Sequence, residues 1–153
     1  MILKIRQRMA RDESGFTLVE LLVVMLILGL LAAIAIPAFF NQRNKAKDAS
    51  AKEAARTAET AVETFATDNG GSYANATPAA LQNIESTLNG ANLTVPTHTA
   101  TTYKVTVTST TGNTFSIARA ANGTTVLSCT PANTDGCPAS TATTAPDGDW
   151  GNG

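Results

Sequence analysis

The chain has 153 residues, of which 43% are hydrophobic and only 15% are charged, with 11 basic against 12 acidic side chains. This length suits one ordinary domain, and a net charge of −1 disfavours a protein that gathers nucleic acid by long-range attraction. The charge is uneven, because residues 1–15 carry four basic and two acidic side chains while the remainder is acidic overall.

Residues 16–36 form an almost unbroken apolar run, FTLVELLVVMLILGLLAAIAI, which is interrupted only by Thr17, Glu20 and Gly29. At about 1.5 Å per residue, a helix of this length measures about 30 Å, the thickness of a bilayer's hydrocarbon core. The run therefore predicts a helix that can cross a membrane.

Three uses of this helix are open: a permanent anchor, a secretory signal peptide, and a segment that stays in the membrane only temporarily. Ala33 and Ala35 give a small-x-small site after a basic region, which suits signal-peptide cleavage. However, the apolar region of a signal peptide spans about 7–15 residues, and Pro37 would follow directly behind the cut. Basic residues on both sides of the run leave its orientation open by the positive-inside rule.

Glu20 is an acidic side chain inside the apolar run. An acidic residue at the centre of a membrane helix costs about 2.5–3.5 kcal/mol, and such residues usually have a partner. In the simplest interpretation, Glu20 lies about 6 Å along the helix from Phe16 and reaches the interface. No Lys, Arg or His lies within residues 16–36, so any charged partner must come from elsewhere.

The motif GFTLVE at residues 15–20, after a basic leader and before the apolar run, resembles the processing site of the type IV pilin family, which includes the pseudopilins of type II secretion. The resemblance implies that a prepilin peptidase cuts between Gly15 and Phe16 and methylates the new N-terminal Phe16. It also implies that Glu20 is the subunit-assembly residue that meets the Phe16 amine of a neighbouring subunit. Opposite charges about 4 Å apart at an effective dielectric constant near 20 attract by about 4 kcal/mol, which offsets the insertion cost.

The apolar periodicity predicts that the helix continues from about Phe16 to Asp68. Beyond residue 50, apolar side chains recur at spacings of three and four and form one stripe; they are Ala51, Ala54, Ala55, Ala58, Ala61, Val62, Phe65 and Ala66. We expect Pro37 to kink the helix rather than end it, and Gly29 and Pro37 fall where the resembling family commonly carries helix-perturbing residues. Asp48 and Lys52 have the spacing of a pair on the helix surface.

The rest of the chain predicts a small domain. Thr77 and Pro78 begin a short helix that ends at residues 89–90, and three strands follow near residues 103–108, 115–117 and 124–129. Asn122-Gly123 indicates a two-residue hairpin. The predicted fold class is α+β, with a long N-terminal helix, hydrophobic in its first half, packed against a small antiparallel sheet of three or more strands.

The corresponding domain organisation has four parts. We expect a leader over residues 1–15 that is removed, and a transmembrane or filament-core helix over residues 16–40. An amphipathic continuation of the helix follows over residues 41–69, and residues 70–153 form a globular head with a C-terminal disulfide loop.

Cys129 and Cys137 lie eight residues apart around a turn, without the second pair that a zinc site needs. They predict a disulfide and an oxidising compartment outside the cytoplasm, with two reduced thiols as the alternative.

Nothing in the sequence favours an enzyme. The only histidine, His98, lies in a threonine-rich segment without a neighbouring carboxylate, and no catalytic, phosphate-binding or dinucleotide-binding motif occurs. Asp147 and Asp149 begin like a calcium loop, but Gly151 stands where the next oxygen ligand is needed. We therefore predict no catalytic residue, no metal and no cofactor.

The favoured function is a structural subunit of a type IV pilus that serves adhesion, twitching motility or DNA uptake. The resemblance implies a single-pass precursor in the inner membrane and then an extracellular filament of this chain. Its partners would be other copies of itself, the prepilin peptidase and the inner-membrane assembly machinery, with nucleic acid added only for a DNA-uptake pilus. The alternatives are a type II secretion pseudopilin and, more distantly, a membrane-anchored surface or ligand-binding domain.

Overall fold

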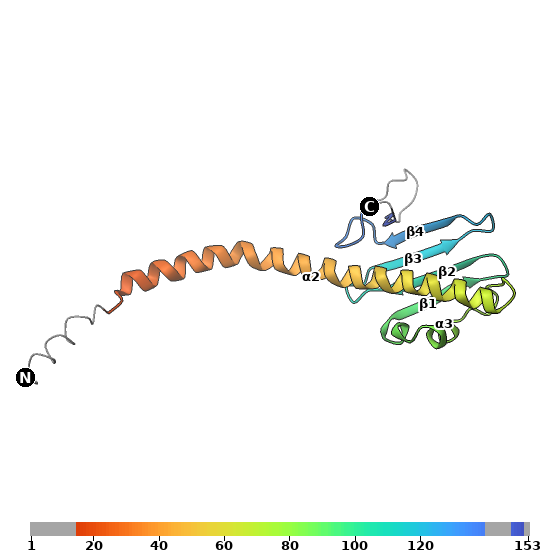
Figure 1. The fold of residues 1–153 in the computed structure, drawn as a ribbon. Coiled ribbons are helices and arrows are strands. Elements are labelled where there is room, and N and C mark those ends of the chain that lie inside the picture. The colour runs from red at the N-terminus through yellow and green to blue at the C-terminus, as the bar shows by residue number, and fades with distance from the viewer. Residues whose placement is uncertain (1–14, 140–147, 152–153) are drawn as a thin grey trace, which may run out of the picture. The chain divides into compact units, whose positions relative to one another are not determined.

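The computed structural model describes residues 15–139 and 148–151 and has the α+β fold that the sequence predicts (Figure 1). The chain divides into two compact units, residues 1–40 and 41–153. Its elements follow in the order α2 (Leu18–Asp68), α3 (Pro78–Ile84), the 3₁₀ helix η1 (Ser86–Gly90), β1 (Asn92–His98), β2 (Tyr103–Thr108), β3 (Thr114–Arg119) and β4 (Thr125–Thr130).

Helix α2 runs without interruption through 51 residues, with Pro37 inside it. It begins at Leu18, two residues later than predicted, because Thr17 occupies the position that precedes the first helical turn. It ends at Asp68 as predicted. Gly70 and Gly71 follow in the left-handed backbone region, and the Gly71 N–H donates to the Ala66 carbonyl at 2.7 Å, which satisfies one of the last helical acceptors.

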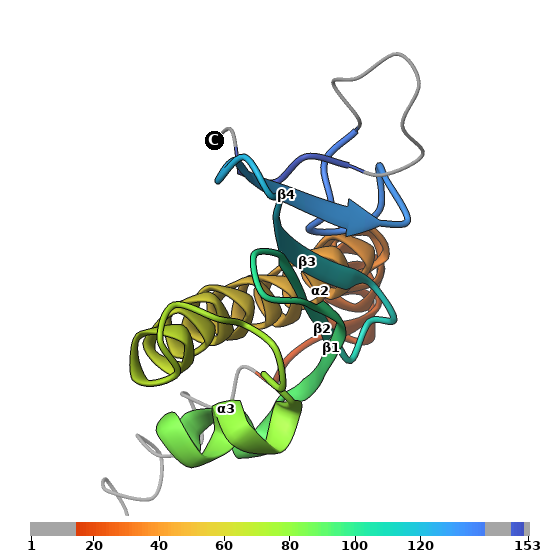
Figure 2. The same ribbon diagram turned by 90° about the vertical axis from the view of Figure 1, so that its right-hand side faces the viewer.

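The four strands form one antiparallel sheet in the order β1-β2-β3-β4. In the central pair, Val105 lies opposite Ile117 and Val107 opposite Phe115, so these four buried side chains share one face. The opposite face is rich in hydroxyl groups, and Thr106 and Ser116 are hydrogen-bonded across the strands at 2.8 Å. Figure 2 shows α3 beside β1, at the other end of the sheet from β4.

The second half of α2 and the inner face of the sheet share one core. The helix contributes mostly alanine at the predicted stripe, and Ala55 and Ala58 are completely buried. Because alanine keeps the helix backbone close to its neighbours, the bulky part of the core comes from other elements, as with Leu81 of α3 and Phe115 of β3.

Three local predictions were wrong or incomplete. Strand β1 was not predicted. Its pairing with β2 is irregular between Thr94 and Thr97, and this gap holds Pro96, a residue tolerated at bulges of edge strands. The expected single short helix is split, because Glu85 is extended and its carboxylate accepts from the Thr87 N–H at the start of η1. Asn122 lies in a longer β3–β4 turn than expected, in which the Ala120 N–H bonds to the Thr124 carbonyl.

The carboxylate of Glu63 ties the end of α2 to the domain. It accepts hydrogen bonds from the hydroxyls of Tyr73 at 2.9 Å and Tyr103 at 3.1 Å, and forms an ion pair with Arg119 at 3.4 Å. Burial and then the negative charge of Glu63 raise the pKa of Tyr103, so its hydroxyl remains a donor at neutral pH.

Candidate functional site

The bond between Gly15 and Phe16, where cleavage is expected, lies outside the helix. Both residues are exposed and non-helical, and the Phe16 side chain is 84% exposed. A Cβ added at Gly15 would meet nothing within 4 Å, so no described part of the chain crowds this bond.

Thr17 and Glu20 form a reciprocal cap on the first turn of α2. The Glu20 carboxylate accepts from both the Thr17 N–H and the Thr17 hydroxyl at 2.8 Å, and the Glu20 N–H donates to the Thr17 hydroxyl oxygen at 3.2 Å. This is a capping box. The sequence contains the signal for this cap, a Thr followed three residues later by Glu, but the cap was not predicted.

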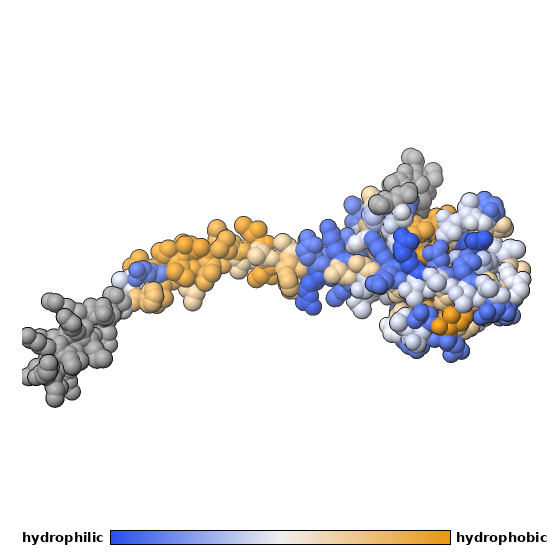
Figure 3. Space-filling view, viewed as in Figure 1, coloured by the Kyte–Doolittle hydropathy of each residue, from blue (hydrophilic) through white to orange (hydrophobic). Residues whose placement is uncertain are grey.

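The first half of α2 carries large apolar side chains on all sides. Their exposed fractions range from 47% for Val23 to 73% for Leu18. By length and composition the helix can cross a membrane. Figure 3 shows this hydrophobic stretch in orange, with hydrophilic side chains directly after it. Because soluble proteins rarely expose so large a continuous apolar surface, this surface calls for lipid or protein around it. Gly29 and Pro37 lie within α2, which continues through both.

Asp48 is the centre of a buried polar cluster that the sequence did not predict. It is completely buried, although its spacing from Lys52 had suggested a pair on the helix surface. Its carboxylate accepts from the Thr111 hydroxyl, from the Asn113 side-chain amide at 2.7 Å and from the Gly136 N–H at 2.9 Å. One carboxylate thus joins α2 to the β2–β3 turn and to the disulfide loop.

The electrostatics of this cluster favour ionised Asp48. Burial acts to raise the pKa of the Asp48 carboxyl, but hydrogen bonds from Thr111, Ser109, Gly136 and Asn113 outweigh it and hold the pKa below its usual value. The backbone of Gly136 lies very close to Asp48, because glycine has no side chain. A Cβ at position 136 would lie 2.5 Å from the Asp48 Cβ.

Cys129 of β4 and Cys137 form a disulfide that closes the loop next to this cluster. Gly148 pairs with Cys129 through two backbone hydrogen bonds of 2.8 Å, and so covers part of the outer edge of β4. Trp150 is buried nearby, and its indole N–H donates to the Ser128 carbonyl at 2.9 Å. The possible calcium ligand Asp147 lies outside the described residues.

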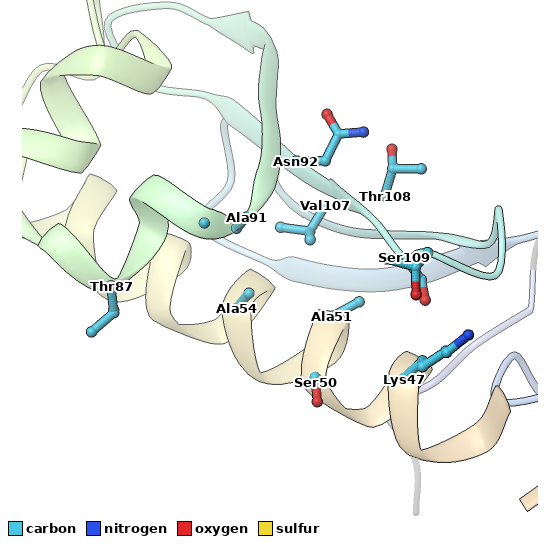
Figure 4. A pocket seen from close by; sticks show the side chains of 12 residues that line it. Lys47, Ser50, Ala51, Ala54, Thr87, Ala91, Asn92, Val107, Thr108 and Ser109 are labelled. Carbon is cyan, nitrogen blue, oxygen red and sulfur yellow. The ribbon is translucent and has the colours of Figure 1, made fainter. Parts of the chain in front are cut away.

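A hollow of about 510 Å³ between α2, η1 and β2 extends from Thr87 at one end to Lys47 at the other (Figure 4). Its walls are mainly small side chains, as with Ala51, Ala54 and Ala91, and lack the paired acid and base that catalysis requires. Residues 15–139 and 148–151 contain no group of three His, Cys, Asp or Glu side chains placed to hold a metal. His98, at the end of β1, is exposed.

Comparison with known protein families finds a match in the N-terminal segment. The family model of the prokaryotic N-terminal methylation motif matches residues 10–36, which include the Gly15–Phe16 bond, Thr17 and Glu20. By this motif, the N-terminal segment of the chain is similar to those of type IV pilins and pseudopilins. Members of this family are structural subunits rather than enzymes.

Curated relatives include members of both branches. The type II secretion system core protein G of Pseudomonas aeruginosa is 39% identical over 59 residues, which cover 39% of this chain and 42% of the relative. The corresponding protein of Aeromonas hydrophila is 37% identical over 59 residues, or 41% of its length. The type IV major pilin protein PilA of Myxococcus xanthus is 43% identical over 53 residues, which cover 35% of this chain and 24% of the relative.

The chain thus spans less than half the length of the curated relatives it matches. No solved structure matches the chain.

The Asp48 cluster yields a test of how the head is held on α2. Asp48→Asn keeps the shape of the side chain but replaces one acceptor with an amide donor, which faces the donors of Asn113 and Gly136. We expect the free energy of unfolding to fall by about 1–3 kcal/mol, the cost of an unpaired buried donor. Unfolding in detergent micelles can be followed by the fluorescence of Trp150, the only tryptophan.

The matched control is Asp68→Asn, an exposed position on the same helix, which should change stability by no more than about 0.5 kcal/mol. Because the Asp48 pKa is lower in the folded than in the unfolded chain, its stabilisation is complete at neutral pH and is lost as the pH falls through the folded-state pKa. The difference between wild type and Asp48→Asn should therefore shrink in acid. A difference that is constant with pH would contradict the role of the ionised carboxylate.

Proposed function

We propose that the chain is the precursor of a filament subunit that is cleaved between Gly15 and Phe16, methylated at Phe16 and assembled from the inner membrane into a type IV pilus. The observation that carries this proposal is that the methylation motif at residues 10–36 occurs together with a helix whose large apolar side chains are exposed. Such a helix is stable in lipid before assembly and among copies of itself afterwards.

In this proposal Glu20 has two successive partners. In the separate subunit its carboxylate accepts from Thr17 of its own chain. In the filament it meets the Phe16 amine of a neighbouring subunit, which supplies the positive charge missing from residues 16–36. Gly29 and Pro37 would loosen the helix backbone between neighbours, because Pro37 removes one helical hydrogen bond and Gly29 lacks a side chain.

A pseudopilin of a type II secretion system is the second candidate, and the two relatives named core protein G favour it. Both candidates share processing, membrane insertion and filament assembly. They differ in the product: long surface fibres made of this chain would favour a pilus, whereas loss of protein secretion on deletion would favour a pseudopilus.

The first test of the proposal is the mature N-terminus. We expect the intact mass of the protein purified from membranes or fibres to equal residues 16–153 plus one methyl group. Tandem mass spectrometry should place that methyl on the amine of Phe16. A mature N-terminus at Ile36 would instead establish a signal peptide and remove the assembly mechanism.

The second test isolates the charge of Glu20. Gln is also found at this position of a capping box, so Glu20→Gln should preserve the first turn of α2 while removing the charge. We expect cleavage and membrane insertion to persist and the fibre yield to collapse. Tagged mutant and wild-type subunits, expressed together, are quantified in membranes and in sheared fibres.

The control for this test is Glu53→Gln, the same substitution at an exposed position further along α2, which should enter fibres like wild type. Equal incorporation of Glu20→Gln and wild-type subunits into fibres would disprove the charge pairing, although not the family assignment.

A further inference from the structure

Three basic side chains follow the apolar half of α2: Arg43, Lys45 and Lys47, here called the collar. All three are exposed. The chain has no acidic residue between Glu20 and Asp48, so the charged side chains between these two positions are all basic.

Other cations of α2 are engaged by the head, unlike the two lysines of the collar. Lys52 lies over the rings of Phe115 at 5.4 Å and Trp150 at 5.9 Å, and Arg56 lies over Trp150 at 5.1 Å. Lys45 and Lys47 make no ion pair, hydrogen bond or ring contact with any described residue.

In the described part of the head, an acidic side chain contacts α2 beside the collar. Asp135 of the disulfide loop accepts from the Asn44 side-chain amide at 3.3 Å, and Asp48 is buried with its oxygens occupied by other donors. Among the described residues, neither Asp135 nor Asp48 forms an ion pair with Lys45 or Lys47.

The collar charges are distributed around the helix rather than along one face. Since each residue turns an α-helix by about 100°, Lys45 lies about 160° from Arg43 and Lys47 only about 40° from it. A protein partner would approach one side of the helix, whereas lipid headgroups surround a membrane helix on every side. This arrangement fits lipid better than a single docked protein.

The collar also lies at a depth in the membrane that suits contact with lipid headgroups. By helical rise, Arg43 lies about 10 Å and Lys47 about 16 Å beyond Ile36, the last residue of the apolar run. Side chains of a helix tilt toward its N-terminus, which here is the direction of the membrane, and long basic side chains extend their charge to the headgroups.

We propose that the collar binds the phosphate groups of anionic phospholipids on the membrane face next to the head, while the subunit is still in the bilayer. This inference rests on the proposed function, because it requires α2 to span the membrane. The bound headgroups would hold the inserted subunit at a fixed depth until it enters the filament.

The test uses the full chain reconstituted in vesicles of four parts phosphatidylcholine to one part phosphatidylglycerol. Discs containing the protein and its adjacent lipids are cut out with an amphipathic polymer, and their lipid composition is compared with that of the whole vesicle. Basic side chains at an anionic surface each attract it, so we expect phosphatidylglycerol to be enriched about two- to five-fold around the wild-type chain. High salt should reduce this enrichment.

The decisive variant is Lys45→Gln/Lys47→Gln, which should bring the enrichment close to unity, while Lys45→Arg/Lys47→Arg should retain it. Lys104→Gln, which removes a cation from β2, should also retain it. The basic residues of the leader are the same in all variants, so the difference between variants reports on the collar alone.

Two results would overturn the proposal: no enrichment around wild type, or equal enrichment around the wild-type chain and the Gln variant. Loss of enrichment in inorganic phosphate, but not in sodium chloride of equal ionic strength, would show that the collar prefers the free anion and would also overturn it. Recovery of the protein outside the vesicles would instead contradict membrane insertion, and with it the proposed function.

Discussion

The exposed apolar surface on the first half of α2 is the constraint on which the rest of the structure depends. Side chains such as Leu18 and Met25 are more than two thirds exposed on this part of the helix. In water such a surface would drive aggregation, so the chain needs a bilayer or other copies of the same helix around it. The proposed cleavage site and the capping box lie at the start of this surface, and the cationic collar follows its end.

The second half of α2 has a different role, because it attaches the small head to one face of the helix. Alanine side chains where α2 meets the sheet let the sheet lie close to the helix, but each alanine buries little apolar area. Two carboxylates add directional contacts: Asp48 fixes the β2–β3 turn and the disulfide loop, and Glu63 fixes Tyr73 and Tyr103. Ionised acceptors with several donors form stronger hydrogen bonds than neutral pairs, which suits a head whose core is small.

The sequence predicted those features that depend on periodicity or on turn residues. The apolar run, the alanine stripe and the glycines after Asp68 predicted α2 almost to its ends, and the alternation in β2 predicted the sheet. Strand β1 was missed because Pro96 interrupts it, and only pairing with β2 makes it a strand. Asp48 was placed on the surface because its spacing from Lys52 is a local signal, whereas its real partners lie more than 60 residues away in the chain. Residues that act through such long-range contacts cannot be found from local patterns.

The central claim is that residues 18–40 of α2 become the core of a filament. Cryo-electron microscopy of fibres sheared from the cell surface, with the chain identified from its side-chain density, tests it most directly. The account predicts first halves of α2 from several copies packed together along the fibre axis, heads on the outside, and density that begins at Phe16. Fibres built only through contacts between heads, with residues 18–40 absent or facing solvent, would contradict it.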